Sequence, residues 1–194
     1  MVQIALLRHG HTDWNRSGRI QGRTDIPLDN EARAELGRMR LPERWQGAAL
    51  YSSPLQRAAE TARLVACEPR TVPELTEMNW GDWEGAHGKK LADDPSSGFR
   101  HIEDWGWAYR PPNGETPQEV WNRIEPWLTG LDHESVLVCH IGIMRVLLAK
   151  AFNWPFQGEA PFRVKRNRLF VLSLENGLLR PAEPLIERLE HKDT

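Results

Sequence analysis

Short runs of hydrophobic residues alternate along the chain with stretches in which hydrophobic residues recur at helical spacing. Residues 2–7 and 135–139 form continuous apolar runs, which are typical of strands buried on both faces of a sheet. The same pattern predicts further strands at residues 48–52, 70–75 and 168–174. We therefore expect five strands spread along the length of the chain.

Helices are predicted between these strands, several with a recognisable start. Asp29 and Ser53 are the predicted N-caps of the first two, because a short polar side chain there can accept a hydrogen bond from the first helical turn. Proline in the first turn supports the starts at Pro54 and Pro117. The predicted helices begin at Asp29, cover residues 54–66, run from Thr116 or Pro117 to about Thr129, and cover residues 141–152.

The alternation of strands and helices predicts an α/β fold. We expect a three-layer α/β/α sandwich, with a mostly parallel central sheet and helices on both of its faces. Residues 8–27 have the composition of a long loop, and residues 78–112, rich in Trp, Gly and charge, predict an ordered excursion over a site. We expect one domain over residues 1–194, with residues 78–115 as an inserted lid that shapes substrate specificity. The charged tail from Arg180 is expected to lie on the surface and fray.

Composition limits the class of protein. The 194 residues are 40% hydrophobic, enough for one core, and carry a formal net charge of −2. Neither nucleic acid nor a membrane is an expected partner, because this charge balance gives no broad basic surface. Cys67 and Cys139 make no disulfide framework, and the first residues have the pattern of a strand and not of a signal peptide. We therefore expect a cytoplasmic protein.

Reactive side chains gather where the predicted parallel strands end. Arg8 and His9 follow the first strand, and Arg57 lies one turn into the helix after the second. Glu77 follows the third strand and His140 the fourth. Ligands of open α/β sheets bind outside the carboxyl ends of the strands. The strand pattern therefore brings two His, two Arg and one carboxylate to one edge.

These residue types suit phosphoryl transfer. A neutral imidazole is a competent nucleophile toward phosphorus, and guanidinium groups hold the charged equatorial oxygens. His140, directly before a helix, adds an N–H donor. The leaving alkoxide needs a proton, for which Glu77 is the predicted donor, although Glu74, Asp82 and Glu84 lie close to it in the sequence.

The stretch LLRHGHTDWN also approaches the spacing of a metal-dependent hydrolase, with His9, His11 and Asp13 two residues apart. That pattern needs a second histidine directly after the aspartate, where this chain has Trp14. Catalytic zinc usually has three protein ligands, and no other cluster in the sequence has the spacing to supply them. We therefore expect no metal and no organic cofactor, with His11 a neighbour of the site and not a ligand.

Five stretches together carry a family resemblance. LLRHGHTDWN, SSPLQRAAETA, LTEMNWGDWEG, PNGET and VCHIGIMR run in this order from residue 4 to about residue 145. In content and order they resemble the motifs of the histidine phosphatase superfamily, in the branch that includes cofactor-dependent phosphoglycerate mutases. His11, where the family usually has Glu or Gln, departs from the pattern.

The resemblance implies a role for each matching residue. His9 would become phosphohistidine, Glu77 would act as acid and then base, and Arg8, Arg57 and His140 would hold the phosphoryl group. Asn15, Gln21 and Gly22 would line the phosphate and substrate pocket. Ile141, which stands where the family commonly has Gly, belongs to the same substrate-binding set.

Three functions fit this resemblance: a phosphomonoester phosphatase, a cofactor-dependent phosphoglycerate mutase, and a non-catalytic module that binds a phosphorylated ligand. The phosphatase is favoured because the chain is shorter than typical mutases and its residues 78–114 lack their basic, Pro-rich stretch for a carboxylated substrate. The module is disfavoured because every reacting group is present. The expected partner is a small-molecule phosphomonoester, and the family makes a homodimer plausible. The segment has five prominent aromatic side chains: Trp80, Trp83, Trp105, Trp107 and Tyr109. Two interpretations of these side chains stay open: they pack the lid, or they form a pocket for a large leaving group.

Overall fold

The computed structural model describes residues 1–192 and has a six-stranded sheet at its centre. In spatial order the strands are β4 (Arg70–Thr71), β3 (Ala49–Ser52), β5 (Ser135–Cys139), β1 (Val2–Arg8), β6 (Arg168–Glu175) and β7 (Leu178–Arg188). The first four are parallel, whereas β6 and β7 run antiparallel to their neighbours. β2 (Met39–Arg40) and β8 (Glu190–His191) form a separate two-stranded ribbon. The predicted mostly parallel α/β sheet is confirmed.

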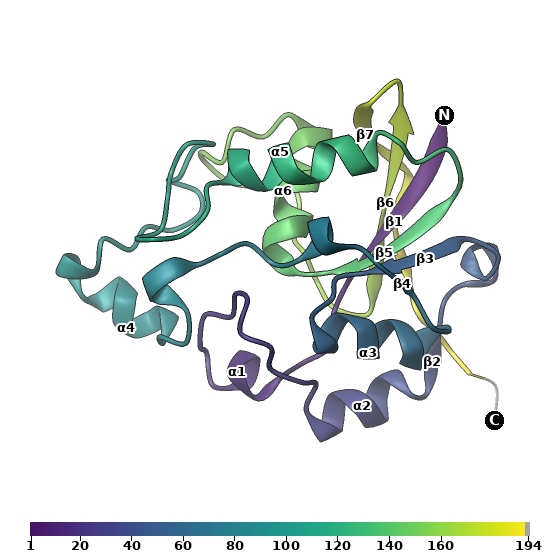
Figure 1. Cartoon of the computed structure of the whole chain (residues 1–194), viewed down its shortest axis with the longest axis horizontal. Helices are drawn as coiled ribbons and strands as arrows, with labels where there is room; N and C mark the ends of the chain where they lie inside the picture. The colour runs from purple at the N-terminus through teal and green to yellow at the C-terminus, as the bar shows by residue number, and fades with distance from the viewer. Residues whose placement is uncertain (193–194) are drawn as a thin grey trace.

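Helices cover both faces of the sheet, as Figure 1 shows. On one face lie α5 (Pro117–Leu128) and α6 (Ile141–Phe152), and on the other α2 (Asn30–Leu36) and α3 (Gln56–Val65). Alternate residues of β1 enter the two cores, because successive side chains of a strand point to opposite faces: Leu6 packs with α5 and α6, and Leu7 packs with α2 and α3.

The helix starts are partly as predicted. The Asp29 side chain accepts a hydrogen bond from Ala32 N at 2.7 Å, and Thr116 forms a capping box with Glu119. The prediction of Ser53 as an N-cap is wrong. Its hydroxyl accepts from Leu55 N at 3.2 Å and tightens the turn after β3, so that α3 begins only at Gln56.

Two strand predictions also need correction. The strand predicted at 70–75 ends at Thr71, because Pro73 has no N–H for the ladder and begins the 3-10 helix η2 (Pro73–Leu75). The tail from Arg180 does not fray as predicted, since β7 pairs with β6 through residue 188. Its prolines and charges, which suggested a surface tail, are those of an edge strand.

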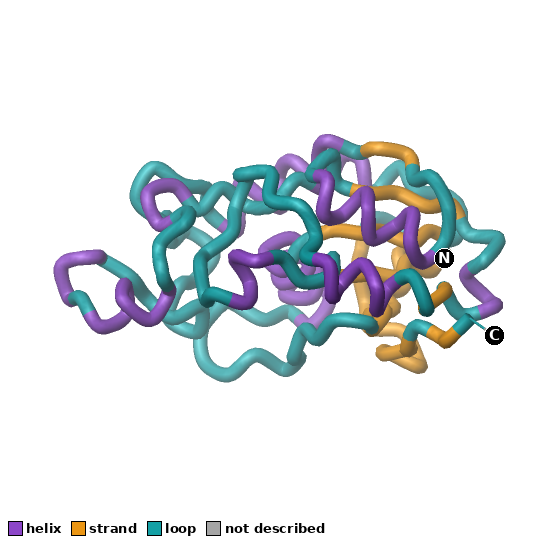
Figure 2. Tube along the Cα trace, turned by 90° about the horizontal axis from the view of Figure 1, so that it is seen from below, coloured by secondary structure: helices purple, strands orange, loops and turns teal. Residues whose placement is uncertain are grey.

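The two aperiodic segments lie together at the carboxyl edge of the parallel strands. The first contains α1 (Asp13–Arg16), and the second contains η3 (Gly81–Trp83), α4 (Gly88–Asp93) and η4 (Pro95–Ser97). Ile20 N donates to Ala86 O at 2.9 Å, which joins the two segments. Figure 2 shows the loops and short helices gathered at one end of the molecule, away from most of the strands. A further 3-10 helix, η1 (Glu43–Trp45), precedes β3.

The rings of the second segment pack mainly against one another. The centroids of Trp80 and Trp105 are 5.4 Å apart, and those of Trp83 and Trp105 are 6.4 Å apart. All three side chains are buried. This arrangement favours lid packing over a pocket lined by these three rings.

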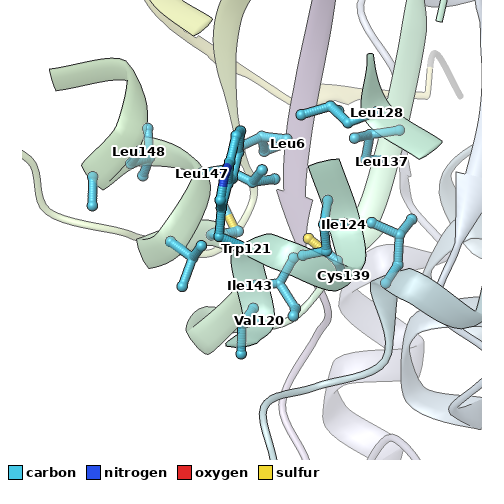
Figure 3. Close-up of a cluster of buried hydrophobic side chains, with 14 of the residues drawn as sticks. Leu6, Val120, Trp121, Ile124, Leu128, Leu137, Cys139, Ile143, Leu147 and Leu148 are labelled. Atoms are coloured by element: carbon cyan, nitrogen blue, oxygen red, sulfur yellow. The ribbon is translucent and has the colours of Figure 1, made fainter. Parts of the chain in front are cut away.

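Cys139, the last residue of β5, points into the core under α5 and α6 (Figure 3). Burial raises the pKa of its thiol, so that it stays protonated despite its place beside His140. None of the helices within residues 1–192 has the length and apolar composition of a membrane-spanning segment.

Candidate active site

His9 lies directly after β1 and is almost fully buried. Its amide donates to Cys139 O at 3.0 Å, and its ring Nδ1 lies 2.7 Å from Gly10 O. A carbonyl oxygen can only accept, so this contact places the ring proton on Nδ1 and leaves the lone pair on Nε2. The local fold therefore leaves Nε2 of His9 available to act as a nucleophile.

The turn after His9 needs glycine. A Cβ at Gly10 would lie 2.7 Å from Leu36 Cδ1, inside the packing between the turn and α2. Gly10 N donates to Thr61 Oγ1 at 3.0 Å, so α3 also holds the turn. Thr61 in turn donates to Arg57 O at 2.7 Å. The helix that carries Arg57 is thereby joined directly to the His9 turn.

Arg57 is fully buried in the first turn of α3. Its Nη1 donates to Thr24 O at 2.9 Å and its Nη2 to Gly22 O at 2.6 Å. Gly22 therefore contributes to the site through its backbone, by holding the guanidinium of Arg57.

His140 lies between the end of β5 and the start of α6, opposite His9. The two ring centroids are 5.1 Å apart. Burial lowers the pKa values of both histidines, and the charge of Arg8, at the end of β1, lowers them further. The predicted pair of histidines with two arginines thus meets at the carboxyl edge of the sheet.

Glu77 is fully buried below α6. Its Oε1 accepts from Met78 N at 2.8 Å and its Oε2 from Gly142 N at 3.2 Å. A Cβ at Gly142 would overlap Oε1, so glycine is required for the carboxyl group to lie there. Burial raises the pKa of Glu77 in spite of these donors and of the positive charges of Arg57 and Arg8.

The backbone around Glu77 is held by arginines on either side. Arg23 Nε donates to Glu77 O at 3.3 Å, and Arg123 Nη2 donates to Thr76 O at 2.7 Å. Both arginines also pair with Glu115. Glu77 is therefore positioned from its backbone as well as from its carboxyl group.

Asn15 and Gln21 form a fixed pair of amides. Asn15 Nδ2 and Thr12 Oγ1 both donate to Gln21 Oε1 at 3.2 Å. Because its oxygen is occupied by two donors, Gln21 presents its Nε2 group as a free donor.

Arg166 joins this site without having been predicted. Its Nε donates to His9 O at 3.2 Å and its Nη2 to Asn15 Oδ1 at 2.8 Å. The sequence prediction placed site residues only at the carboxyl ends of strands. Because β6 is antiparallel to β1, its amino end lies at the same edge of the sheet, with Leu169 opposite Leu7. A prediction of the direction of β6 would have pointed to the KRNR stretch before it.

The cluster is strongly positive. Burial lowers the pKa of His9 well below its ordinary value, and the positive charges of Arg57, Arg8 and Arg166 reinforce this. Burial also lowers the pKa of Arg8 to about 9. This value is still above neutral pH, so the guanidinium stays charged there. Within residues 1–192, the following buried nitrogens of the cluster have no hydrogen-bond partner: Arg8 Nε, Gln21 Nε2, Arg57 Nε and both ring nitrogens of His140. The guanidinium and amide N–H groups, with the one N–H of the neutral His140 ring, fit an anion with several oxygens.

The remaining predicted residues lie around this cluster. Ile141 begins α6 and lines a cavity of about 230 Å³ together with Arg145. His11 O accepts from Asp29 N at 3.0 Å. No group of three or more His, Cys, Asp or Glu side chains that could hold a metal ion occurs in the described part of the chain.

Comparison with known proteins identifies the family. A family model of the histidine phosphatase superfamily (branch 1) matches residues 4–182. The chain belongs to this superfamily. The resemblance carried by the five sequence motifs is thereby confirmed.

Relatives within the superfamily include proteins named as phosphatases and as mutases. The adenosylcobalamin/alpha-ribazole phosphatase of Salmonella typhimurium is 33% identical over 177 residues, which cover 85% of this chain and 87% of the relative. A probable phosphoglycerate mutase of Enterobacter is 29% identical over 175 residues, which cover 85% of this chain and 81% of the relative. The crystal structure of a phosphoglycerate mutase from Thermus thermophilus has a TM-score of 0.74 and 32% identity, and covers 98% of this chain and 100% of that one.

Proposed function

We propose that the protein is a phosphomonoester hydrolase that works through a phosphohistidine on His9. The observation that carries the proposal is the arrangement around His9: a neutral imidazole with its Nε2 lone pair free, among buried donors from Arg8, Arg57, Gln21 and His140 that have no hydrogen-bond partner within residues 1–192. Such donors suit the equatorial oxygens of a transferring phosphoryl group.

In the first step, His9 Nε2 attacks phosphorus and the bond from phosphorus to the leaving oxygen breaks. Glu77, whose raised pKa favours the protonated carboxyl, gives its proton to that oxygen. In the second step, water attacks the phosphohistidine, the Glu77 carboxylate takes a proton from the water, and the P–N bond breaks. Inorganic phosphate and the free alcohol are the products.

Arg8, Arg57 and His140 hold the phosphoryl oxygens in this proposal, and Asn15 and Gln21 complete the pocket. No step requires a metal ion or an organic cofactor. Residues 78–115 act as the lid, with Glu115 anchoring their end to Arg23 and Arg123. A phosphoglycerate mutase is the alternative, since several relatives bear that name.

A single assay in EDTA distinguishes these functions. Purified protein is incubated with a panel of phosphomonoesters, and separately with 3-phosphoglycerate plus catalytic 2,3-bisphosphoglycerate, while free phosphate and 2-phosphoglycerate are followed. We expect phosphate release without isomerisation. Isomerisation much faster than phosphate release would establish the mutase, and a strict need for a divalent ion would contradict the metal-free mechanism.

Arg166 acts in this proposal by positioning Asn15 and the His9 backbone. Replacing it (Arg166→Met) removes charged hydrogen bonds, so we expect kcat/KM to fall by about tenfold to hundredfold. The loss should overlap with that of Asn15→Ala: in a double-mutant cycle, the double variant should be little worse than the single ones. Arg168→Met, two residues along in β6, is the matched control and should keep wild-type rates. Additive losses would show that Arg166 does not act through Asn15.

A further inference from the structure

Glu84 follows η3 in the segment 78–115, and its side chain reaches the loop between α1 and α2. Its Oε2 accepts from Arg23 N at 3.1 Å, and its Oε1 accepts from Thr24 N. Each carboxylate oxygen therefore receives one of two successive backbone N–H groups. Hydrogen bonds to a carboxylate are among the stronger ones in proteins, so this contact fixes the direction of the backbone at these residues.

The approach of Glu84 to the loop requires glycine at position 22. A Cβ at Gly22 would lie 2.5 Å from Glu84 Oε2 and 3.0 Å from Glu84 Cδ. On the same side, Trp80 Cδ1 would be 3.1 Å from that Cβ. A larger residue at position 22 would therefore displace the carboxyl group of Glu84 from the two backbone N–H groups.

The same backbone holds Arg57 on its opposite side. Arg57 Nη2 donates to Gly22 O at 2.6 Å, and Arg57 Nη1 donates to Thr24 O at 2.9 Å. The C=O of Gly22 and the N–H of Arg23 belong to one trans peptide group, so they point in opposite directions. Glu84 therefore binds one end of this peptide group, and Arg57 binds the other end.

The position of this peptide group determines how Arg57 faces the phosphoryl site. The Arg57 side chain is fully buried, and its guanidinium is planar, so two hydrogen bonds to carbonyl oxygens fix the plane and the direction of its remaining N–H groups. Burial lowers the pKa of Arg57, and Glu84 is among the carboxylates whose charge opposes this. The contacts thus run from Glu84 through the loop backbone to Arg57.

Glu84 is not needed merely to join the two segments. Directly beside it, Gly85 N donates to Ile20 O at 2.8 Å and Ile20 N donates to Ala86 O at 2.9 Å. Arg19 Nη1 also donates to Gly85 O at 2.7 Å. Because these bonds join the segments without any carboxylate, the two bonds of Glu84 at residues 23 and 24 call for a separate explanation.

We propose that Glu84 is a positioning residue of the phosphoryl site, which holds the peptide group between Gly22 and Arg23 so that Arg57 faces the transferring phosphoryl group. The inference rests on the proposed phosphatase function, in which Arg57 holds a phosphoryl oxygen. Glu84 does not contact the substrate in this proposal. Its consequence is that the segment 78–115 contributes to phosphate recognition.

Glu84→Gln tests the proposal. Glutamine keeps the size of the side chain, but an NH₂ group that cannot accept replaces one oxygen and meets a backbone N–H. We expect the Kd of inorganic phosphate, measured by titration calorimetry, to rise by about tenfold, as the loss of one charged hydrogen bond would give. For p-nitrophenyl phosphate and for an alkyl phosphate, kcat/KM should fall by similar factors, and the pH profile should keep its wild-type shape, because proton transfer by Glu77 is unchanged.

Asp82→Asn is the matched control. It removes a carboxylate from the same short helix, but Asp82 is exposed and accepts from Asn113 Nδ2 at 2.9 Å within the segment 78–115. Phosphate affinity and rates should stay at wild-type values. Circular dichroism checks folding, and if Glu84→Gln is unfolded, Gly22→Ala must raise the Kd of phosphate, because its Cβ displaces the same carboxyl group.

A double-mutant cycle shows whether Glu84 acts through Arg57. Arg57→Lys replaces the planar guanidinium by a single ammonium group, which cannot bind both carbonyl oxygens in the same way. On kcat/KM for p-nitrophenyl phosphate, the double variant should then be little worse than Arg57→Lys alone. Losses that multiply would show that Glu84 does not act through Arg57 and would overturn the proposal.

The outcomes separate this inference from the proposed function. If Glu84→Gln binds phosphate and hydrolyses esters like the wild type, the positioning role is overturned while the phosphatase stands. If the wild type binds phosphate but hydrolyses no ester, the phosphatase proposal fails, and the phosphate affinity of Glu84→Gln still decides whether Glu84 supports the anion site. If the wild type neither binds phosphate nor hydrolyses an ester, both proposals fail.

Discussion

Replacing His9 with alanine abolishes phosphate release, with an expected fall in kcat of at least about 10⁴-fold, comparable to the loss of a nucleophile in other covalent enzymes. The reason is that, in the proposed mechanism, the lone pair on Nε2 of His9 attacks phosphorus, while Nδ1 is committed to Gly10 O. The measurement is steady-state phosphate release, with trapping of the phosphoenzyme from a ³²P-labelled ester. Label on the wild type should be lost in acid and stable in alkali, as for phosphohistidine, and absent from His9→Ala.

The matched control is His101→Ala, which removes an exposed imidazole from the segment 78–115. It should label and turn over like the wild type. Labelling of His9→Ala at His140, or retention of a tenth or more of the wild-type rate (an order-of-magnitude threshold), would place the nucleophile elsewhere.

Glu77→Gln should lower kcat for alkyl phosphates by about 10²- to 10⁴-fold, the usual contribution of general acid catalysis. The loss should be much smaller for p-nitrophenyl phosphate, because p-nitrophenolate leaves without a proton. Glutamine keeps the shape of the carboxyl group but cannot supply that proton. Comparison of the two substrate classes therefore isolates proton transfer from any general disturbance of the site.

The pH dependence follows from the same residue. Burial raises the pKa of Glu77, so its protonated form persists to higher pH than in an ordinary carboxyl, and the rate for alkyl phosphates should fall as pH rises through that raised pKa. Titration of His9 should not lower the rate within this pH range, because burial lowers its pKa and its ring is already neutral there. The alkaline fall should vanish in Glu77→Gln. If Glu74→Gln and not Glu77→Gln gave these effects, the acid would be wrongly assigned.

The positions of the two histidines in the fold could be predicted because each follows a strand with a clear apolar pattern. His9 and His140 come directly after β1 and β5, whose residues are almost all buried, so the pattern fixed both their ends and their direction. Asp29 and Thr116 were predictable for a local reason, since an N-cap depends on residues within the same turn.

The residues that were missed depend on contacts between distant segments. Arg166 reaches Asn15 only because β6 runs antiparallel to β1, a choice that no local pattern in the sequence encodes. β7 was missed because an edge strand with Pro181 and Pro184 has the composition of a loop. The role of the Gly22 backbone likewise appears only once α3 is packed against the loop.

The segment that follows α6 has a practical consequence for redesign. Phe162, Arg163 and Val164 line the cavity, whereas Arg166, two residues further on, contacts His9 and Asn15. One short stretch therefore lines the cavity and contacts the histidine turn at neighbouring positions. Exchanging residues 160–164 while keeping Arg166 offers a route to new cavity shapes by loop grafting, with the contacts at His9 and Asn15 left as they are.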